Sequence, residues 1–311
     1  MINILFSARA AQWPVYRAPL ETAFAEKGLE FTLTDHTDSP ETIDYLVYAP
    51  AREDDDLSVY SNLKLIQSLW AGPDKLLKNK TLTQPMARMV DPGMTQGMAD
   101  YVFGHIMRHH LEVDRFTNAK PGDWLMDWAP PLPAERTVAI LGIGALGMAC
   151  AKVAHDYGFN VIGWSRTQKD DAPFACYAGA EGLEKALREA DIIVTLLPNT
   201  PATEKVINEK TIAQMKDGAA LINPGRGQLI DDDAFLAALN SGKISGATLD
   251  VFHTEPLPAE HPYWHHPNVL VTPHVASETR VDTAARVVAE NIARVEKGQN
   301  ALHLIDPALK Y

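Results

Sequence analysis

The chain of 311 residues carries 28 lysines and arginines against 40 aspartates and glutamates, which gives a formal net charge of −12 at pH 7. A nucleic acid or an anionic membrane surface requires clustered positive charge, so this balance argues against both as partners. With 46% hydrophobic and 22% charged residues, the composition is that of a globular protein. A length above about 250 residues favours two domains over a single core.

The two cysteines, Cys150 and Cys176, are too few for a disulfide framework at this length, which indicates a reducing compartment. The first residues have no basic segment ahead of a long apolar core, so we expect no signal peptide. The longest weakly polar stretch, residues 137–154, contains three glycines and Lys152, and we expect no membrane-spanning segment there. The sequence therefore predicts a cytoplasmic protein.

The first hundred residues alternate short β-type runs with helical runs, as in a parallel α/β layer. A helix is expected at residues 19–27, with Gly28 as its stop. A long helical pattern runs from Gln96 to about Asn118, and a loop rich in Trp and Pro follows. The strands of this part are expected at residues 2–6, 31–33, 45–48 and 65–69.

The second part of the chain repeats this alternation, with the wholly apolar strands that are typical of a buried parallel sheet. Strands are expected at residues 137–141, 161–164, 192–197, 219–222, 247–251 and 269–272. Helices are expected at residues 145–157, 183–189, 231–240 and 278–298. We interpret the three aspartates at 231–233 as helix caps, because negative charge is favoured at a helix N-terminus.

Residues 142–147 read Gly-Ile-Gly-Ala-Leu-Gly, directly after a buried strand and directly before a helix. In this context Gly142 permits a tight turn, Gly144 lets the backbone approach a pyrophosphate, and Gly147 allows close packing of helix on strand. The helix N-terminus offers unpaired N–H groups to the anion. The sequence therefore predicts a dinucleotide site rather than a glycine-rich turn without a ligand. Its residues would be Gly142, Gly144, Ala145, Leu146 and Gly147.

The next strand ends in Trp-Ser165-Arg166-Thr and carries no carboxylate there. A site for NAD usually has an acidic residue at this point to bind the ribose 2′-hydroxyl. Ser165 followed by Arg166 would instead accept a 2′-phosphate, because the arginine supplies a charge-assisted hydrogen bond and no carboxylate repels the phosphate. The sequence predicts NADP(H) in preference to NAD(H); the alternative is that Arg166 is a solvated surface residue.

Three ionisable residues follow strands in the second part: Arg226 in Asn-Pro-Gly-Arg-Gly, Glu255 in Asp-Val-Phe-His-Thr-Glu-Pro and His274 in Thr-Pro-His-Val-Ala. Ligands bind at the carboxyl ends of strands in an open α/β sheet, so these side chains can converge. His274 suits a proton donor near neutral pH, and a paired Glu255 would favour its charged form. Arg226 presents a planar fork to a substrate carboxylate. The three together fit the reduction of a 2-oxo acid.

With these segments in this order, the sequence resembles the D-2-hydroxyacid dehydrogenase family over nearly its whole length. The resemblance implies Arg226, Glu255 and His274 as the catalytic set. It also implies an α/β fold of two doubly wound parallel-sheet domains, with a Rossmann nucleotide domain inserted into a flavodoxin-like substrate domain. The substrate domain would comprise residues 1–98 and 273–311, and the NAD(P)-binding domain residues 99–272.

Within the family, residues 163–166, 196–200 and 298–311 resemble the branch that reduces glyoxylate and hydroxypyruvate. The resemblance thus implies NADPH-dependent reduction of glyoxylate to glycolate and of hydroxypyruvate to D-glycerate, with His274 as the proton donor. Two alternatives stay open: a dehydrogenase of bulkier D-2-hydroxy acids, and a non-catalytic NAD(P)H-sensing protein on the same scaffold. Further cofactor contacts implied by the resemblance are Leu197, Pro198, Thr203, Pro224, Gly225, Asp250 and Ala276.

The segment Ser-Leu-Trp70-Ala71-Gly72-Pro73-Asp matches the family's loop whose backbone N–H groups bind the substrate carboxylate. Pro73 has no N–H, so Ala71 and Gly72 are the safer donors. Trp70 would narrow the pocket for a small substrate, or it is a core tryptophan at the domain junction. These residues would complete the substrate site that Arg226 and His274 begin.

Three histidines, His261, His265 and His266, suggest a metal site, because imidazoles four residues apart can share a helix face. The flanking Pro262 and Pro267 indicate a loop instead, and the segment lacks a further set of spaced ligands. We expect no metal.

We interpret His105, His109 and His110 on the long helix as packing or surface residues. In the family this helix and the loop that contains Trp124 and Trp128 lie at a dimer contact. The resemblance therefore implies a homodimer that binds a small 2-oxo or 2-hydroxy acid.

Overall fold

The computed structural model describes residues 1–50, 55–72 and 76–305. The chain divides into two compact units, Met1–Met94 with Glu278–Tyr311, and Thr95–Ser277. The expected boundaries, after residues 98 and 272, differ from these by about one helical turn and one short loop. The reason is packing: Met94 is buried in the core of the first unit, whereas Met98 and Ala276 are buried in the second.

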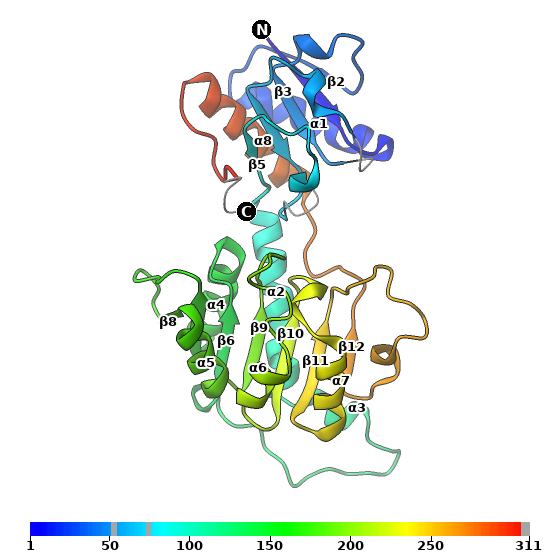
Figure 1. Cartoon of the computed structure of the whole chain (residues 1–311), viewed down its shortest axis with the longest axis vertical. Helices are drawn as coiled ribbons and strands as arrows, with labels where there is room; N and C mark the ends of the chain where they lie inside the picture. The colour runs from blue at the N-terminus through cyan, green and yellow to red at the C-terminus, as the bar shows by residue number, and fades with distance from the viewer. Residues whose placement is uncertain (51–54, 73–75, 306–311) are drawn as a thin grey trace. The chain divides into compact units, whose positions relative to one another are not determined.

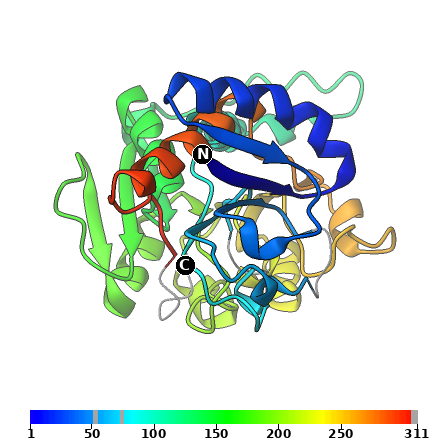
Figure 2. The same ribbon diagram turned by 90° about the horizontal axis from the view of Figure 1, so that it is seen from above.

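The first unit is built on a five-stranded sheet in the order β2-β1-β3-β4-β5, with every neighbouring pair parallel (Figure 1). This is the flavodoxin-like strand order. Its strands are β1 (Ile2–Ser7), β2 (Phe31–Thr34), β3 (Tyr45–Tyr48), β4 (Leu65–Ser68) and β5 (Met86–Ala87). Helices α1 (Trp13–Glu26) and α8 (Val281–Glu296) pack side by side (Figure 2).

The two faces of this sheet bury different sets of apolar side chains, as the alternation of a strand requires. Ile4 and Phe6 pack with Phe24 of α1 and Ile292 of α8. Leu5, on the opposite face, belongs to a second cluster with Leu46, Ile66, Leu57 and Leu76.

The second unit is built on a seven-stranded parallel sheet in the order β12-β11-β10-β9-β6-β7-β8. Counted from β6, this is the classic 3-2-1-4-5-6 Rossmann order with one strand added. The strands are β6 (Thr137–Leu141), β7 (Asn160–Ser165), β8 (Ala175–Ala178), β9 (Ile192–Thr195), β10 (Ala219–Asn223), β11 (Ile244–Leu249) and β12 (Val269–Val271). The strand order reverses between β6 and β9, which is where ligands bind in such sheets.

Helices cover both faces of the second sheet (Figure 1). Val102 of α2 and Cys150 of α4 are buried with Val138 of β6, whereas Leu187 of α5 and Phe235 of α7 are buried in the cluster on the other face. The helices are α2 (Pro92–His110), α3 (Val113–Thr117), α4 (Ala145–Tyr157), α5 (Gly179–Glu189), α6 (Glu209–Gln214) and α7 (Asp232–Ser241). Short 3-10 turns lie at Ala10–Gln12, Pro40–Thr42, Leu57–Val59, Leu76–Lys78, Pro133–Glu135, Gly227–Leu229 and Pro262–His265.

Helices α1 and α2 differ most from their expected extents. Pro14 lies in the first turn of α1, and Pro19, which we expected at its start, lies inside it. The buried face of Tyr16, Leu20 and Phe24 continues through Pro19, so packing outweighs the lost backbone hydrogen bond. The helix expected at 96–118 ends at His110, and α3 follows after Glu112 in the left-handed conformation at φ 50°.

The membrane prediction can be compared with the helices that the structure describes. Over those residues, none is both long and apolar enough to cross a bilayer.

Candidate active site

The three glycines of residues 142–147 occupy the turn between β6 and α4. Gly142 has φ +111°, and a Cβ there would lie 2.5 Å from the carbonyl oxygen of Leu196. A Cβ on Gly147 would lie 1.9 Å from the carbonyl oxygen of Gly142. At Gly144, the N-cap of α4, an added Cβ would meet nothing within 4 Å. The outer glycines are thus fixed by packing, and the middle one leaves open space beside the helix N-terminus, which fits a bound pyrophosphate.

The end of β7 carries the residues expected to select the cofactor. The Ser165 hydroxyl donates to the carbonyl oxygen of Thr167 at 2.5 Å, which shapes the turn that presents the exposed Arg166. Gly163 in the same strand is needed because a Cβ there would lie 2.7 Å from Ile143 and 2.8 Å from the sulfur of Cys176. The strand end therefore packs directly against the glycine turn and β8.

The remaining predicted cofactor residues all lie after the carboxyl ends of strands in the second sheet. Thr203, after β9, uses its hydroxyl locally: it donates to the carbonyl oxygen of Pro198 at 2.5 Å. Leu197 is 8% exposed. After β10, Pro224 and Gly225 form the turn before Arg226, and a Cβ on Gly225 would lie 2.7 Å from the carbonyl oxygen of Thr195. Their contacts with a cofactor stay predictions.

His274 and Glu255 form a hydrogen-bonded pair in the second unit. His274 Nδ1 lies 2.8 Å from Glu255 Oε2, and Glu255 Oε1 accepts a hydrogen bond from the backbone N–H of Phe252 at 3.0 Å. The His274 side chain is 54% exposed. Because Nδ1 faces Glu255, Nε2 is the ring nitrogen left to act on a substrate.

Arg226 belongs to the same cluster. Burial raises the pKa of the Glu255 carboxyl, but the hydrogen bonds from His274 and Phe252 and the charges of His274 and Arg226 act the other way, and the net pKa lies below its ordinary value. Glu255 is therefore ionised at neutral pH. The structure thus brings together the three side chains that the sequence placed in separate loops.

The loop that carries Arg226 is held by residues that the sequence reasoning did not single out. Asn223, fully buried, accepts hydrogen bonds from the Thr195 hydroxyl at 2.7 Å and from the Gly225 N–H at 3.1 Å, and its amide donates to the Arg226 carbonyl at 3.0 Å. Gly227 lies against backbone, since a Cβ there would be 2.1 Å from the carbonyl carbon of Phe252. An asparagine at the end of a buried strand and directly before Pro-Gly is the signal that could have identified this role.

Asp250, expected at the cofactor, holds the loop after β12. Its carboxylate accepts hydrogen bonds from the Thr272 hydroxyl at 2.6 Å and from the N–H groups of Val275 and Ala276, both at 2.9 Å. The structure therefore shows a scaffolding role for this side chain. The expected contacts of Asp250 and Ala276 with a cofactor stay predictions.

The predicted substrate loop follows β4 in the first unit. The N–H of Trp70 donates to the Ser68 hydroxyl at 2.9 Å, and the carbonyl of Trp70 accepts from the N–H of Met89 at 2.9 Å. Its ring is partly buried against both apolar clusters of that unit. Ala71 and Gly72 follow it, and Pro73 lies outside the described residues. A substrate contact for this loop stays a prediction.

The histidines outside the site have local roles. His261 Nδ1 accepts from the N–H of Tyr263 at 3.3 Å, and His266 Nδ1 accepts from that of Asn268 at 3.2 Å. On α2, burial lowers the pKa of His105 to about 4 and that of His109 to about 3, so both are neutral packing residues. Over residues 1–50, 55–72 and 76–305, no group of three His, Cys, Asp or Glu is placed to hold a metal ion.

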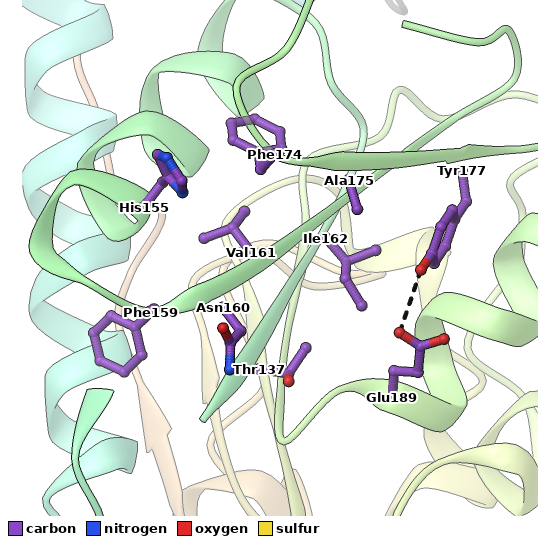
Figure 3. Close-up of a pocket in the computed structure, with 10 residues that line it drawn as sticks. All are labelled: Thr137, His155, Phe159, Asn160, Val161, Ile162, Phe174, Ala175, Tyr177 and Glu189. Carbon is purple, nitrogen blue, oxygen red and sulfur yellow. Dashed lines mark hydrogen bonds between the residues drawn. The ribbon is translucent and has the colours of Figure 1, made fainter. Parts of the chain in front are cut away.

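A cavity of about 420 Å³ lies at the amino ends of β6, β7 and β8 (Figure 3). Thr137 and Asn160 line it at the starts of two strands, and Tyr177 and Glu189 line it from β8 and α5. The Tyr177 hydroxyl donates to Glu189 at 3.3 Å. None of the residues expected in the active site is among those that line it.

Sequence comparison places the second unit in a known family. Residues 102–276 match the D-isomer specific 2-hydroxyacid dehydrogenase, NAD binding domain. The chain belongs to the D-isomer-specific 2-hydroxyacid dehydrogenase family. This dehydrogenase is 37% identical over 276 residues to glyoxylate/hydroxypyruvate reductase A of Serratia proteamaculans (strain 568), which covers 86% of this chain and 87% of that protein. It is an oxidoreductase that uses NAD(P).

Solved structures extend the similarity to both units. A D-isomer-specific 2-hydroxyacid dehydrogenase from Xanthobacter autotrophicus Py2, in complex with NADPH and MES, has a TM-score of 0.91 and 36% identity over 99% of both chains. The NADPH-dependent glyoxylate/hydroxypyruvate reductase of Sinorhizobium meliloti, in complex with NADP and sulfate, has a TM-score of 0.87 and 31% identity over 100% of both chains. The predicted fold of this dehydrogenase is confirmed.

Proposed function

We propose that this dehydrogenase catalyses NADPH-dependent reduction of small 2-oxo acids, glyoxylate to glycolate and hydroxypyruvate to D-glycerate. The observation that carries the proposal is the 2.8 Å hydrogen bond between His274 and Glu255, beside the charge of Arg226. The glyoxylate/hydroxypyruvate reductases of Serratia proteamaculans and Sinorhizobium meliloti, at 37% and 31% identity, support the choice of substrates.

The site residues divide the chemistry between them. The reduced nicotinamide, when bound, supplies the hydride that C2 of the 2-oxo acid accepts. His274 gives its Nε2 proton to the forming alkoxide, so the oxo acid gains one hydride and one proton and becomes the 2-hydroxy acid. The ionised Glu255 orients the ring through Nδ1 and stabilises the imidazolium before transfer. Arg226 binds the substrate carboxylate and fixes the direction of C2.

NADPH is the proposed cofactor. Arg166 stands exposed at the end of β7, where the side chain of an acidic residue would repel a 2′-phosphate. The solved relatives from Xanthobacter autotrophicus Py2 and Sinorhizobium meliloti hold NADPH and NADP respectively, which supports this choice. The open position at Gly144 fits the pyrophosphate.

One turnover panel tests the proposal. Purified protein is given NADPH or NADH with glyoxylate, hydroxypyruvate, pyruvate, 2-oxoisovalerate and phenylpyruvate, and cofactor oxidation is followed at 340 nm. We expect the highest kcat/KM with NADPH as the cofactor and with glyoxylate and hydroxypyruvate as the substrates. A preference for branched or aryl acids would identify a dehydrogenase of bulkier substrates, and tight NADPH binding without turnover would identify a sensor.

We also propose a homodimer formed through the segment after α2. Trp124 is 82% exposed and Met126 is 72% exposed, and the ring of Phe116 lies 5.8 Å from that of Trp128. Large apolar side chains exposed together in one segment are typical of an interface. Light scattering after size exclusion should give the mass of a dimer, and Trp124→Asp with Met126→Asp should shift it toward 34.2 kDa, the mass of one chain. A wild-type monomer would contradict the proposal.

The location proposed for this protein is the cytoplasm. Both cysteines are free thiols, with Cys150 buried and Cys176 half-buried, which suits a reducing compartment. Fractionation of cells that express the tagged protein tests this.

A further inference from the structure

Asp250 binds three consecutive N–H groups of the loop that carries His274. The N–H of His274 donates to the backbone carbonyl of Asp250 at 2.8 Å. The next two N–H groups, of Val275 and Ala276, donate to the two carboxylate oxygens of Asp250, each at 2.9 Å. Asp250 is fully buried. The Asp250 carboxylate therefore sets the path of Val275 and Ala276, directly after His274.

His274 needs such support because its backbone is strained. Its φ is +56°, in the left-handed region that a residue with a Cβ seldom adopts. Such a conformation persists only where surrounding bonds enforce it. It directs the imidazole to Glu255, at 2.8 Å. If the carboxylate of Asp250 moved, the loop could relax and the imidazole would lose its direction.

The hydroxyl of Thr272 binds that carboxylate, and the hydroxyl of Tyr101 binds Thr272 in turn. Thr272 Oγ1 lies 2.6 Å from Asp250 Oδ1, and Tyr101 Oη, from α2, lies 2.7 Å from Thr272 Oγ1. A carboxylate only accepts hydrogen bonds, so the single hydroxyl proton of Thr272 goes to Asp250. The Tyr101 hydroxyl must then donate to Thr272. The result is a chain of hydrogen bonds in which Tyr101 donates to Thr272 and Thr272 donates to Asp250.

Tyr101 is well placed to remain a donor. Burial raises the pKa of its hydroxyl and outweighs the opposite effect of the hydrogen bond with Thr272, and the charge of Asp250 adds to the increase, so Tyr101 keeps its proton at neutral pH. Its ring packs edge-on against that of His105, with centroids 4.4 Å apart, which restrains the ring on the helix. The hydrogen-bonded chain therefore begins at a residue of α2, outside the loops that carry Arg226, Glu255 and His274.

We infer that Tyr101 and Thr272 are positioning residues for His274, which act by holding the Asp250 carboxylate in the orientation that keeps the 272–276 loop in place. This rests on the proposed role of His274 as proton donor. The sequence gives no sign of it, because Tyr101 stands far from the catalytic motifs along the chain. The hydroxyl of each residue, rather than its bulk, carries the role.

Kinetics of four single variants test the inference. Thr272→Val keeps the shape of the side chain and removes the hydroxyl, Thr272→Ser keeps the hydroxyl, and Tyr101→Phe removes the outer one. Tyr177→Phe is the matched control, because its hydroxyl also serves a carboxylate, that of Glu189, at the amino ends of the strands (Figure 3). With NADPH and glyoxylate, kcat should fall about tenfold in Thr272→Val and about threefold in Tyr101→Phe.

A role in positioning predicts a specific pattern. KM for NADPH should change less than about threefold in both variants, Thr272→Ser should recover kcat to within about twofold of wild type, and Tyr177→Phe should match wild type. The double variant Tyr101→Phe/Thr272→Val should have the same kcat as Thr272→Val alone, because loss of the Thr272 hydroxyl already removes the link between Tyr101 and Asp250. Unchanged kcat in both hydroxyl-deleted variants, or no recovery in Thr272→Ser, would overturn the inference.

Amide hydrogen exchange gives an independent readout that needs no turnover. In Thr272→Val the N–H groups of Val275 and Ala276 should exchange about tenfold faster than in wild type, with little change elsewhere. If wild-type protein reduces no 2-oxo acid, the proposed function is wrong. The rates of amide exchange then test the hydrogen-bonded chain independently of that function. Equal exchange in wild type, Thr272→Val and Tyr101→Phe would refute the chain itself. If Thr272→Val does not fold, Tyr101→Phe carries both measurements.

Discussion

The two ends of the seven-stranded sheet both bring a carboxylate to a titratable side chain, but they do so in different ways. At the carboxyl ends, Glu255 lies 2.8 Å from His274 and has a lowered pKa. At the amino ends, Glu189 lies 3.3 Å from the Tyr177 hydroxyl beside a cavity of about 420 Å³ (Figure 3). This cavity lies at the end of the sheet that lacks the family's motifs.

The difference lies in the backbone around each pair. His274 has a φ of +56° and sits in a loop whose N–H groups are bound by Asp250, while Glu255 accepts a backbone hydrogen bond from Phe252. Tyr177 and Glu189 stand on a regular strand and helix, β8 and α5. A histidine held against an ionised carboxylate, on loops that follow the carboxyl ends of parallel strands, indicates catalysis better than a cavity alone does.

The strongest way to test this contrast is to remove one histidine from each end. His274→Ala deletes the proposed proton donor, and kcat for glyoxylate reduction should fall by about 10²–10⁴-fold, the usual contribution of general acid catalysis. His155→Ala, which removes a histidine that lines the amino-end cavity, should leave kcat within about twofold. Steady-state kinetics at saturating NADPH give both values. Equal rates for wild type and His274→Ala would refute the role of His274.

From the sequence alone we could predict the three side chains that the structure brings together, but not the residues that support them. Arg226, Glu255 and His274 each lie in a loop that follows a strand, and parallel topology brings strand ends to one edge. The supports Asn223 and Thr272 could not be ranked in advance, because their value comes from hydrogen bonds across loops. Such bonds depend on loop geometry, which hydrophobic periodicity does not encode.

Glu255→Gln tests whether the charge of the pair matters beyond its shape. Gln keeps a similar side chain but cannot stabilise an imidazolium, so kcat should fall about 10–100-fold and the alkaline limb of the kcat profile should move to lower pH. The pKa of Glu255 in the folded protein is lowered from its ordinary value of 4.5. The ionised carboxylate therefore stabilises the fold above pH 4.5, and this stabilisation is lost as the pH falls through the pKa of the folded state. The stability gap between wild type and variant should therefore close in acid. An unshifted profile would argue against the pair.

The glycine turn offers a pair of substitutions with different expected effects. Gly147→Ala drives a methyl group into the Gly142 carbonyl and should cost about 1–3 kcal/mol of folding stability. Gly144→Ala meets nothing within 4 Å, so it should melt within a few degrees of wild type while NADPH binding weakens about tenfold or more. Thermal melting and NADPH fluorescence titration separate the two. If Gly144→Ala bound NADPH as wild type does, the pyrophosphate would have to lie elsewhere.

The fold could be predicted from sequence where burial made the pattern strong. Strands Tyr45–Tyr48 and Thr137–Leu141 and helix Ala145–Tyr157 have the expected bounds, because each is apolar on its buried positions and ends at a clear signal such as Gly158. The two-residue β5 and the edge strand β8 were missed. Both strands are short and lie at an edge of their sheet, where each pairs with one neighbouring strand only. Pairing with that neighbour, rather than a local pattern of apolar residues, determines that they form.

A smaller effect is expected at the end of β7, where we propose that the charge of Arg166 selects the cofactor. The chain has a net charge of −12, so its overall field repels NADPH and local cations must bind the 2′-phosphate. Arg166→Ala should lower kcat/KM for NADPH about tenfold and leave that for NADH within about twofold. Arg188→Ala, an exposed arginine of α5, is the matched control and should change neither. An equal loss with both cofactors would count against recognition of the 2′-phosphate.

The smallest effect should come from changing Tyr177 and its hydrogen bond with Glu189, at the amino ends of the strands. Tyr177→Phe removes a 3.3 Å hydrogen bond to Glu189, a half-buried group that water can reach, so unfolding free energy should change by less than about 0.5 kcal/mol and kcat should not change. Tyr263→Phe makes a useful contrast: its hydroxyl donates to Asp232 at 2.8 Å from a ring only 2% exposed, and it should cost about 1 kcal/mol. Urea unfolding measures both. A marked loss of activity in Tyr177→Phe would mean that the amino end communicates with the catalytic loops, and the contrast between the two ends would no longer hold.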